Sequence, residues 1–153
     1  MSAPGSTRPH AQDDQERIWY ACSCHCGATL FKVLHESIEP SSSNQHPVTA
    51  CNCSICVKSG YHLIYVLRKD IQFIKGWEDL KNYRFASKTR DHKFCGICGT
   101  SIGIDFLGQH KLGDALGINV RVIEGIDIQE MRMADINGRE YQPEFNNKSP
   151  RAW

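Results

Sequence analysis

The pattern of hydrophobic and polar residues along the chain predicts a series of short β-strands. Residues 28–35 (ATLFKVLH) mix apolar with polar side chains and include β-branched and aromatic residues, as a half-buried strand does. Residues 61–68 (YHLIYVLR) are strongly strand-like, and residues 70–76 (DIQFIKG) end at a glycine that favours a turn. Three further strands are expected at residues 79–87 (DLKNYRFAS), 100–106 (TSIGIDF) and 115–123 (ALGINVRVI). The sum is an all-β, or at least β-dominated, domain.

Polar segments frame this strand-rich region. Residues 1–17 are rich in Ser, Pro, Gln and acidic residues, which predicts a disordered N-terminal tail. Residues 139–153 are similarly polar and are expected to form a C-terminal extension. No linker or internal repeat interrupts residues 18–138, so we expect one domain there, with a surface loop at residues 40–50 (PSSSNQHPVTA). Short helical turns are expected in two segments, CSICVKSG (53–60) and EGIDIQEM (124–131).

Composition and charge exclude several classes of protein. A chain of 153 residues with 41% hydrophobic and 23% charged residues is typical of one soluble globular domain. The net charge of +1 and the scattered Lys and Arg residues give no electrostatic basis for binding nucleic acid or an anionic membrane. No apolar stretch is long enough to span a bilayer, and the N-terminus lacks the apolar core of a signal peptide. We therefore expect a cytoplasmic protein without nucleic-acid or membrane partners.

The eight cysteines are the most informative residues of the chain. In a reducing cytosol, clustered cysteines are more often metal ligands or reactive thiols than disulfides. Cysteines scattered through a core would not cluster. The grouping therefore favours metal sites over the disulfide alternative. The three groups are Cys22, Cys24 and Cys26; Cys51, Cys53 and Cys56; and Cys95 and Cys98.

Four of these cysteines predict a closed zinc site. Cys95 and Cys98, in FCGICGTSI, have the spacing of a zinc knuckle, and Gly99 permits the positive φ needed just after it. The redox interpretation of Cys-x-x-Cys is disfavoured because the motif leads into a strand rather than opening a helix. Cys24 and Cys26 stand beside another glycine turn and can supply the second pair of ligands. A site closed by four thiolates is structural, since it leaves no position for a substrate.

The triplet Cys51, Cys53 and Cys56 predicts a different kind of site. A tight loop of this spacing can place three thiolates around one Zn²⁺ and leave the fourth position open, which is typical of a catalytic zinc. A thiol that binds such an ion is deprotonated outright. We therefore expect these three residues to be catalytic and the reaction to make or break a carbon–sulfur bond.

A fourth protein ligand would instead make the second site structural. Cys22, His62 and His92 are the candidates nearest the clusters in sequence. On an extended strand Cys22 faces the same way as Cys24 and Cys26, which keeps it near the other ion. The alternative is that Cys22 is a small buried thiol and that the two histidines are ordinary strand or surface residues.

The cysteine motifs resemble one enzyme family. CHCGA (24–28), CNCSICVKSG (51–60) and FCGICGT (94–100) are similar to the glutathione-dependent formaldehyde-activating enzyme family, which includes the centromere protein V group. GINVRVIEGIDI (117–128) looks like the final strand and turn of that family, and the resemblance covers about residues 18–138. It implies an Mss4-like β-tent with two zinc ions, one structural and one catalytic.

The resemblance also implies which cysteines bind each ion. Cys24 and Cys26 would join Cys95 and Cys98 around the structural zinc, and the triplet would hold the catalytic zinc, in agreement with the interpretation from spacing. Cys22 departs from the usual pattern of the family, in which a small residue other than cysteine is common at this position.

The activity implied by the resemblance is condensation of formaldehyde with glutathione to S-hydroxymethylglutathione, formally a carbon–sulfur lyase reaction run backwards. The partner would be a small-molecule substrate, glutathione or another thiol. Candidate substrate-binding residues are Lys58, Asn119 and Arg121; the last two would share one face of the strand 115–123.

Two alternatives to this activity stay open. One is an enzyme that acts on a different small molecule, in detoxification or metabolite tailoring. The other is a non-catalytic, zinc-stapled binding module, which a closed second site would favour. Exposed β edges are compatible with a homodimer.

Overall fold

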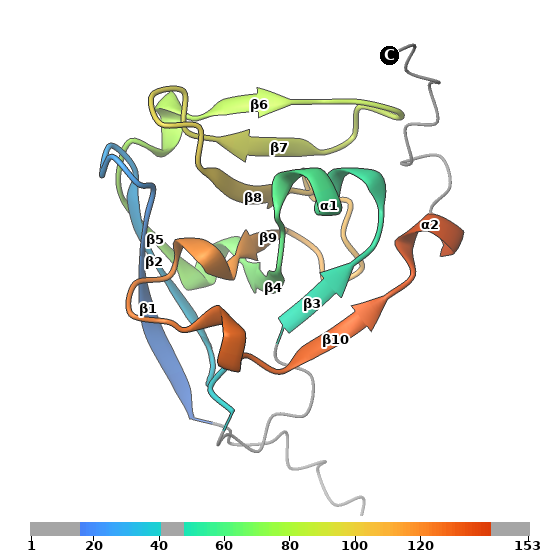
Figure 1. Cartoon of the computed structure of the whole chain (residues 1–153). Coiled ribbons are helices and arrows are strands. Elements are labelled where there is room, and N and C mark those ends of the chain that lie inside the picture. The colour runs from blue at the N-terminus through green and yellow to red at the C-terminus, as the bar shows by residue number, and fades with distance from the viewer. Residues whose placement is uncertain (1–15, 41–47, 142–153) are drawn as a thin grey trace, which may run out of the picture.

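A computed structural model describes residues 16–40 and 48–141, which fold into two β-sheets with short helical segments between the strands (Figure 1). The small sheet has the order β1-β2-β5, and the large sheet has the order β10-β3-β4-β9-β8-β7-β6. All neighbouring strands are antiparallel except β10 and β3, which run parallel. The architecture confirms the predicted all-β, Mss4-like fold class.

The elements have the following bounds. The small sheet consists of β1 (Arg17–Ser23), β2 (Leu30–Glu36) and β5 (Ile71–Lys75). The large sheet consists of β3 (Val48–Cys51), β4 (Leu63–Leu67), β6 (Lys81–Tyr83), β7 (Asp91–Phe94), β8 (Ser101–Asp105), β9 (Ala115–Asn119) and β10 (Met133–Ile136). The α-helices are α1 (Ser54–Ser59) and α2 (Gly138–Tyr141). The 3-10 turns are η1 (Arg68–Asp70), η2 (Trp77–Asp79), η3 (Val120–Val122) and η4 (Ile128–Glu130).

The middle of the large sheet is buried on both faces, which explains the strongly apolar sequence of β4. Ile64 and Val66 point to one face, opposite Ile118 and Leu116 of β9, and pack into the main core with Phe31 and Val33 of the small sheet. Leu63 and Tyr65 point to the other face, toward Ile104 and Phe106. The sheet therefore separates a closed core from a second apolar cluster, and this second cluster contains Cys53 and Cys56.

The turn after β5 depends on a glycine, as the sequence predicts. Gly76 has φ of 77°, in the left-handed region, and a Cβ there would collide with the carbonyl oxygen of Ala28. The same turn lets Trp77 fold back, so that its ring meets Phe31 at 5.3 Å between centroids and Phe73 at 4.6 Å. Backbone contact and aromatic packing together hold the end of β5 against the start of β2.

Several predicted boundaries are wrong, and the corrections have local causes. The strand predicted over 115–123 ends at Asn119, whose side chain accepts the backbone N–H of Arg121 and starts the turn η3. The strand predicted over 79–87 is only three residues long, and the loop predicted over 40–50 runs into β3 at Val48. Strands β7 and β10 were not predicted, because neither has an alternating apolar pattern. Both expected helical segments are present, as α1 and η4.

The predicted ends of the domain lie partly outside the described residues. The disorder expected for residues 1–17 falls there except for Glu16 and Arg17, and Arg17 is the first residue of β1. The predicted boundary after residue 138 falls inside α2, and residues 142–153 of the predicted extension are not described. None of the helices in the described part of the chain is long and apolar enough to span a membrane.

Candidate metal centres and active site

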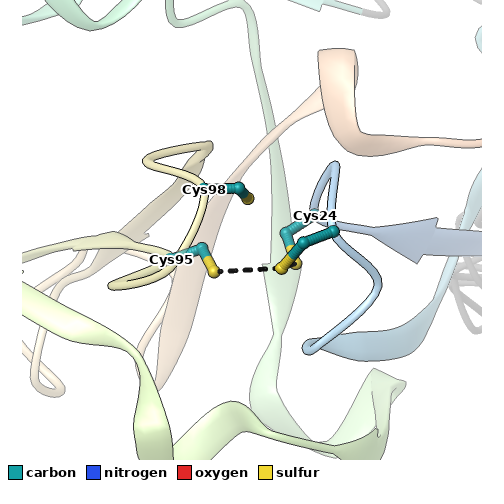
Figure 2. Close-up of side chains that lie close together, drawn as sticks. Cys24, Cys95 and Cys98 are labelled. Atoms are coloured by element: carbon teal, nitrogen blue, oxygen red, sulfur yellow. Dashed lines mark hydrogen bonds between the residues drawn. The ribbon is translucent and has the colours of Figure 1, made fainter.

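Four cysteines from two turns meet between the sheets. Cys24 and Cys26 lie in the turn from β1 to β2, and Cys95 and Cys98 lie in the turn from β7 to β8. Their sulfur atoms all lie within 4.8 Å of one another. Figure 2 shows the side chains of Cys24, Cys95 and Cys98 converging from the two turns. The arrangement links the small sheet to the large one.

The backbone conformation of both turns allows the four sulfurs to converge. Gly27 and Gly99 each follow the second cysteine of a pair and each has φ of 76°, in the left-handed region expected for Gly99. The N–H of Gly99 donates to the carbonyl of Cys95 at 2.9 Å. The N–H groups of Thr29 and Ile97 point at the sulfurs of Cys24 and Cys95, each at 3.4 Å. Such N–H groups stabilise thiolates, the form of cysteine that binds a metal.

The sulfur spacing fits a tetrahedral zinc ion. With Zn–S bonds of about 2.3 Å, tetrahedral geometry places neighbouring sulfurs about 3.8 Å apart. The sulfurs of Cys24 and Cys26 are 3.6 Å apart, and those of Cys26 and Cys95 are 3.7 Å apart. These distances are far from a disulfide bond of about 2.0 Å, and all eight cysteines are free thiols. The cluster could therefore hold a metal ion.

Cys22 stands apart from this cluster. It is only 2% exposed and packs in the main core, because β1 continues to Ser23 and the turn that carries the other two cysteines begins after it. Burial, reinforced by the charge of Glu124, raises the pKa of Cys22 to about 12. Cys22 is grouped with neither set of candidate metal ligands, and its thiol is a neutral core side chain.

The second cluster is built by the loop that joins β3 to α1. Cys51 is the last residue of β3, Cys53 is the N-cap of α1, and Cys56 is one turn further along that helix. The three sulfurs lie within 4.8 Å of one another. Among the described residues, no fourth His, Cys, Asp or Glu side chain joins them. The donor set could hold a metal ion, with one tetrahedral position that no side chain of this group fills.

A cavity of about 160 Å³ opens directly onto this triplet. Its size is close to the ~150 Å³ of an engineered cavity that takes up benzene. The wall is mostly apolar, with a few polar side chains set into it. Besides the three cysteines it is lined by Thr49, Ile55, Leu63, Tyr65, Arg90, His92, Ile104, Phe106, His110, Ile136 and Gly138. Small-molecule sites commonly combine an apolar wall with a few convergent polar groups.

The histidines of this cavity are neutral at physiological pH. Burial, with charge repulsion from Arg90, lowers the pKa of His92 to about 4. Burial also lowers the pKa of His110, in the same direction as the charges of Lys111 and Arg90. The N–H of Leu112 donates to Nδ1 of His110 at 3.1 Å, so the proton of this neutral imidazole is on Nε2. His110 therefore offers a hydrogen-bond donor.

Two aromatic groups hold the polar side chains of the cavity in place. Tyr65 stacks on His110 with centroids 5.1 Å apart, and Phe106 meets His110 at 4.7 Å. The guanidinium of Arg90 lies 5.1 Å from the centre of the Phe106 ring, a cation–π distance. Burial raises the pKa of Tyr65, so this phenol stays protonated. The arrangement sets one cation and one neutral donor beside the triplet.

The candidate residues Lys58, Asn119 and Arg121 lie outside this cavity. Lys58 is exposed on α1. Asn119 is 2% exposed, and its amide donates to the carbonyl of Ser101 while accepting the N–H groups of His62 and Arg121. Arg121 donates from Nε to the carbonyl of Gly60 at 3.0 Å. Because η3 follows Asn119, the common strand face expected for Asn119 and Arg121 does not form. Their role toward substrate stays a prediction.

The two histidines weighed as metal ligands join neither cluster. His92 lines the cavity and meets the hydroxyl of Tyr61 at 3.4 Å. Nδ1 of His62 is buried without a hydrogen-bond partner among the described residues. Neither histidine is grouped with the triplet.

The sequence analysis missed Arg90 and His110. Both stand in loops without a recognisable motif, one between β6 and β7 and the other between β8 and β9. The folded sheet brings both residues to the same cavity, and no local sequence pattern indicates this. The only available signal is that each is a polar residue close to a strand end.

Comparison with known proteins agrees with this geometry. A family model described as glutathione-dependent formaldehyde-activating enzyme matches residues 19–134. Among solved structures, a crystal structure of a Rhodobacter sphaeroides protein superposes with a TM-score of 0.58 at 24% sequence identity. The alignment covers 74% of this chain and 99% of that one, and at this identity it supports the fold alone.

Proposed function

Since the chain belongs to the glutathione-dependent formaldehyde-activating enzyme family, we propose that it joins a thiol to an aldehyde at the triplet Cys51, Cys53 and Cys56. The observation that carries the proposal is the pairing of three converging cysteines with a cavity that opens onto them. Glutathione and formaldehyde are the substrates proposed first. The reaction is that of a carbon–sulfur lyase run toward synthesis.

The triplet is the proposed catalytic centre. Zinc held there by Cys51, Cys53 and Cys56 would supply the Lewis acidity that turns a bound thiol into its thiolate at neutral pH. The other cysteine cluster, formed by Cys24, Cys26, Cys95 and Cys98, would hold a second, structural zinc.

The cavity suits the reacting end of such a substrate. At about 160 Å³ it is smaller than the roughly 300–1,000 Å³ of sites that enclose a whole drug-sized ligand. The thiol-bearing end of a tripeptide and a one-carbon aldehyde fit inside, and the rest of the tripeptide would lie along the mouth. The apolar wall, including Leu63, Ile104 and Phe106, limits water around the reacting atoms.

Arg90 is proposed to bind a carboxylate of the thiol substrate. Of the described residues that line the cavity, it is the one that carries a full positive charge at neutral pH, since His92 and His110 are neutral. A guanidinium binds a carboxylate through charge-assisted hydrogen bonds. Glutathione has two carboxylates, so this contact favours it over a small neutral thiol.

His110 is proposed to steady the aldehyde oxygen. Condensation breaks the S–H bond, forms the C–S bond and leaves the former carbonyl oxygen with a proton. Negative charge grows on that oxygen as the sulfur adds, and Nε2–H of neutral His110 can donate a hydrogen bond to it. Ring contacts with Tyr65 and Phe106 would keep the imidazole of His110 in this orientation.

Lys58, Asn119 and Arg121 remain proposals from sequence for contacts with the substrate. Lys58, exposed on the helix that carries Cys56, is the candidate for a part of the thiol that extends beyond the cavity. Arg121 lies at the end of the same helix and Asn119 supports it from β9.

The apolar wall favours a second candidate function. Formaldehyde fills little of a cavity that would take a benzene-sized group. Condensation of glutathione with an aromatic or branched aldehyde would bury that group against Ile104 and Phe106. Comparing formaldehyde with benzaldehyde, each with and without glutathione, distinguishes the two candidates.

A thiol titration of the cobalt-substituted protein tests whether the second site is open. We expect added glutathione to change the d–d absorption bands of one of two bound Co²⁺ ions, because it enters the vacant position beside the triplet. Cys53→Ser should abolish that change, and Cys22→Ala, which removes a thiol outside both clusters, should keep it. An unchanged spectrum at saturating glutathione would favour a closed structural site and the binding-module alternative.

A further inference from the structure

Asn52 lies between Cys51 and Cys53 of the triplet, and both its side chain and its backbone are hydrogen-bonded to residues 136–139. Its side-chain Nδ2 donates to Oδ1 of Asn137 at 2.9 Å, and its Oδ1 accepts the N–H of Arg139 at 3.2 Å. Its own N–H donates to the carbonyl of Ile136 at 3.1 Å. We call this set of three hydrogen bonds the Asn52–Asn137 clasp. It fixes the peptide that joins Cys51 to Cys53.

The segment is braced on its far side as well. Nδ2 of Asn137 donates to Oε2 of Glu140 at 2.9 Å, and the N–H of Glu140 donates back to the carbonyl of Asn137 at 3.1 Å. Both polar atoms of the Asn137 amide are therefore used, one toward the triplet loop and one toward α2. The amide can adopt one orientation only, since a flip would break both bonds.

Gly138 brings the segment into contact with the triplet itself. It is buried, it lines the cavity, and its backbone is hydrogen-bonded to the thiol of Cys51. A Cβ at this position would collide with Sγ of Cys51 and would reach 3.1 Å from Cβ of Cys53. Only glycine therefore lets the segment approach this closely.

Parallel pairing places the segment at this spot. β10 runs beside β3 with Ile136 opposite Cys51, so the chain leaves the sheet at the triplet. Ile136 then lines the cavity from the same side as Gly138. These residues lie beyond the family match, which ends at residue 134.

We propose that residues 136–140 are a positioning element of the triplet: the Asn52–Asn137 clasp and Gly138 fix the cysteine geometry and close one wall of the cavity. Through this element residues 136–140 control the affinity of the triplet for its metal. The proposal rests on the proposed function only in taking the triplet as a metal site, and its test does not require turnover.

The test is release of metal to a chromophoric chelator from the protein loaded with two Zn²⁺. In the wild type we expect a slower phase from the closed cluster and a faster phase from the triplet. Asn137→Ala should speed the triplet phase about tenfold, since groups that support metal ligands typically change metal affinity by 10–100-fold. The closed-cluster phase should not change, and it reports in the same experiment that the variant is folded.

A double-mutant cycle separates a specific clasp from general destabilisation. If Asn52 and Asn137 act through each other, the double variant should speed the triplet phase by clearly less than the product of the factors for Asn52→Ala and Asn137→Ala, since each single variant already breaks their shared bond. Asn82→Ala, which removes a partly buried hydrogen bond from Lys93 at the far edge of the same sheet, is the control and should leave the triplet phase at the wild-type rate.

Gly138→Ala provides an independent variant. We expect it to bind one Zn²⁺ instead of two, because the new methyl group displaces Sγ of Cys51. Gly96→Ala, whose methyl group would have the flexible side chain of Lys81 as its nearest neighbour, should still bind two. Wild-type release from the triplet in Asn52→Ala and Asn137→Ala, or a full complement of two tightly held ions in Gly138→Ala, would overturn the proposal.

Discussion

Cys26 and Cys95 stand 69 positions apart in the chain and bring their sulfurs within 3.7 Å of each other. One belongs to a turn of the small sheet and the other to a turn of the large sheet. A metal bound there would tie the two sheets together at a point remote in sequence. The triplet, by contrast, lies within six residues of one loop and crosslinks nothing distant.

This contrast predicts different consequences for losing each metal. Cys95→Ser should lose one equivalent of zinc and destabilise the fold by about 3 kcal/mol or more, because the binding energy of a structural zinc is folding energy. Cys53→Ser should also lose one equivalent but cost only about 1 kcal/mol, the scale of an ordinary substitution. Metal analysis combined with chemical unfolding measures both. Equal destabilisation by the two variants would contradict the assignment of structural and open sites.

His92 predicts a pH dependence of stability. Its pKa of about 4 in the folded protein is below the ordinary value of 6.5, so the unfolded chain binds the proton more readily. The stability that neutral His92 contributes is fully present above about pH 6.5 and is lost as the pH falls toward 4. Because acid also protonates metal-binding thiolates, the comparison must be with a variant that keeps them.

His92→Gln is that variant. Between pH 6.5 and 4 the wild type should lose about 2 kcal/mol more unfolding free energy than His92→Gln, a value set below the full shift because the ring lines an open cavity. Urea unfolding at several pH values gives both curves. Parallel curves over this range would show that His92 is not held neutral by the fold.

Arg90 and Arg121 predict different kinetic effects. Arg90→Ala should raise KM for glutathione about tenfold, the scale of one charge-assisted hydrogen bond, with a smaller effect on kcat. Arg121→Ala removes a hydrogen bond to the carbonyl of Gly60 at the end of α1 and should change KM less than Arg90→Ala does. Lys88→Ala, which removes a cation from the same loop as Arg90, is the control for loss of charge. The reverse order of effects would favour the sequence-based proposal for Arg121.

Substituting Gly76 by alanine is expected to lower the free energy of unfolding strongly. Gly76→Ala combines a left-handed φ of 77° with a collision against the carbonyl of Ala28, so we expect a loss of about 3 kcal/mol or more. Gly125→Ala has a similar φ of 74° but meets open space, so it should cost only about 1 kcal/mol. Thermal unfolding of the two variants distinguishes the backbone collision from the φ penalty. Equal losses would contradict the close approach of the two turns.

Much of this architecture was predictable because its causes are local. Strand β4 is apolar at successive positions because it is buried on both faces, and the glycine after Cys98 has the left-handed φ that its knuckle requires. The spacing of the triplet likewise reflects one loop and the first turn of one helix. Each of these features leaves a recognisable pattern in a short run of adjacent residues.

The features that could not be predicted depend on distant partners. The sequence of β7 is mostly polar, yet the strand is buried. Asp91 lies beside the guanidinium of Arg84, and Lys93 lies over the ring of Trp77 at 5.5 Å. β10 is a strand because it pairs with β3, some eighty residues earlier in the chain. Arg90 and His110 reach the cavity from two separate loops, and only the folded sheet brings them together.

The rate of condensation of glutathione with ¹³C-formaldehyde, followed by exchange NMR at neutral pH, shows whether the triplet Cys51, Cys53 and Cys56 carries out the reaction. The uncatalysed reaction is subtracted, and omission of glutathione is the second blank. We expect acceleration by the wild type and by Cys22→Ala, and none by Cys53→Ser despite a native fold and one remaining zinc. Acceleration by Cys53→Ser equal to that of the wild type would contradict the assignment of the reaction to the triplet.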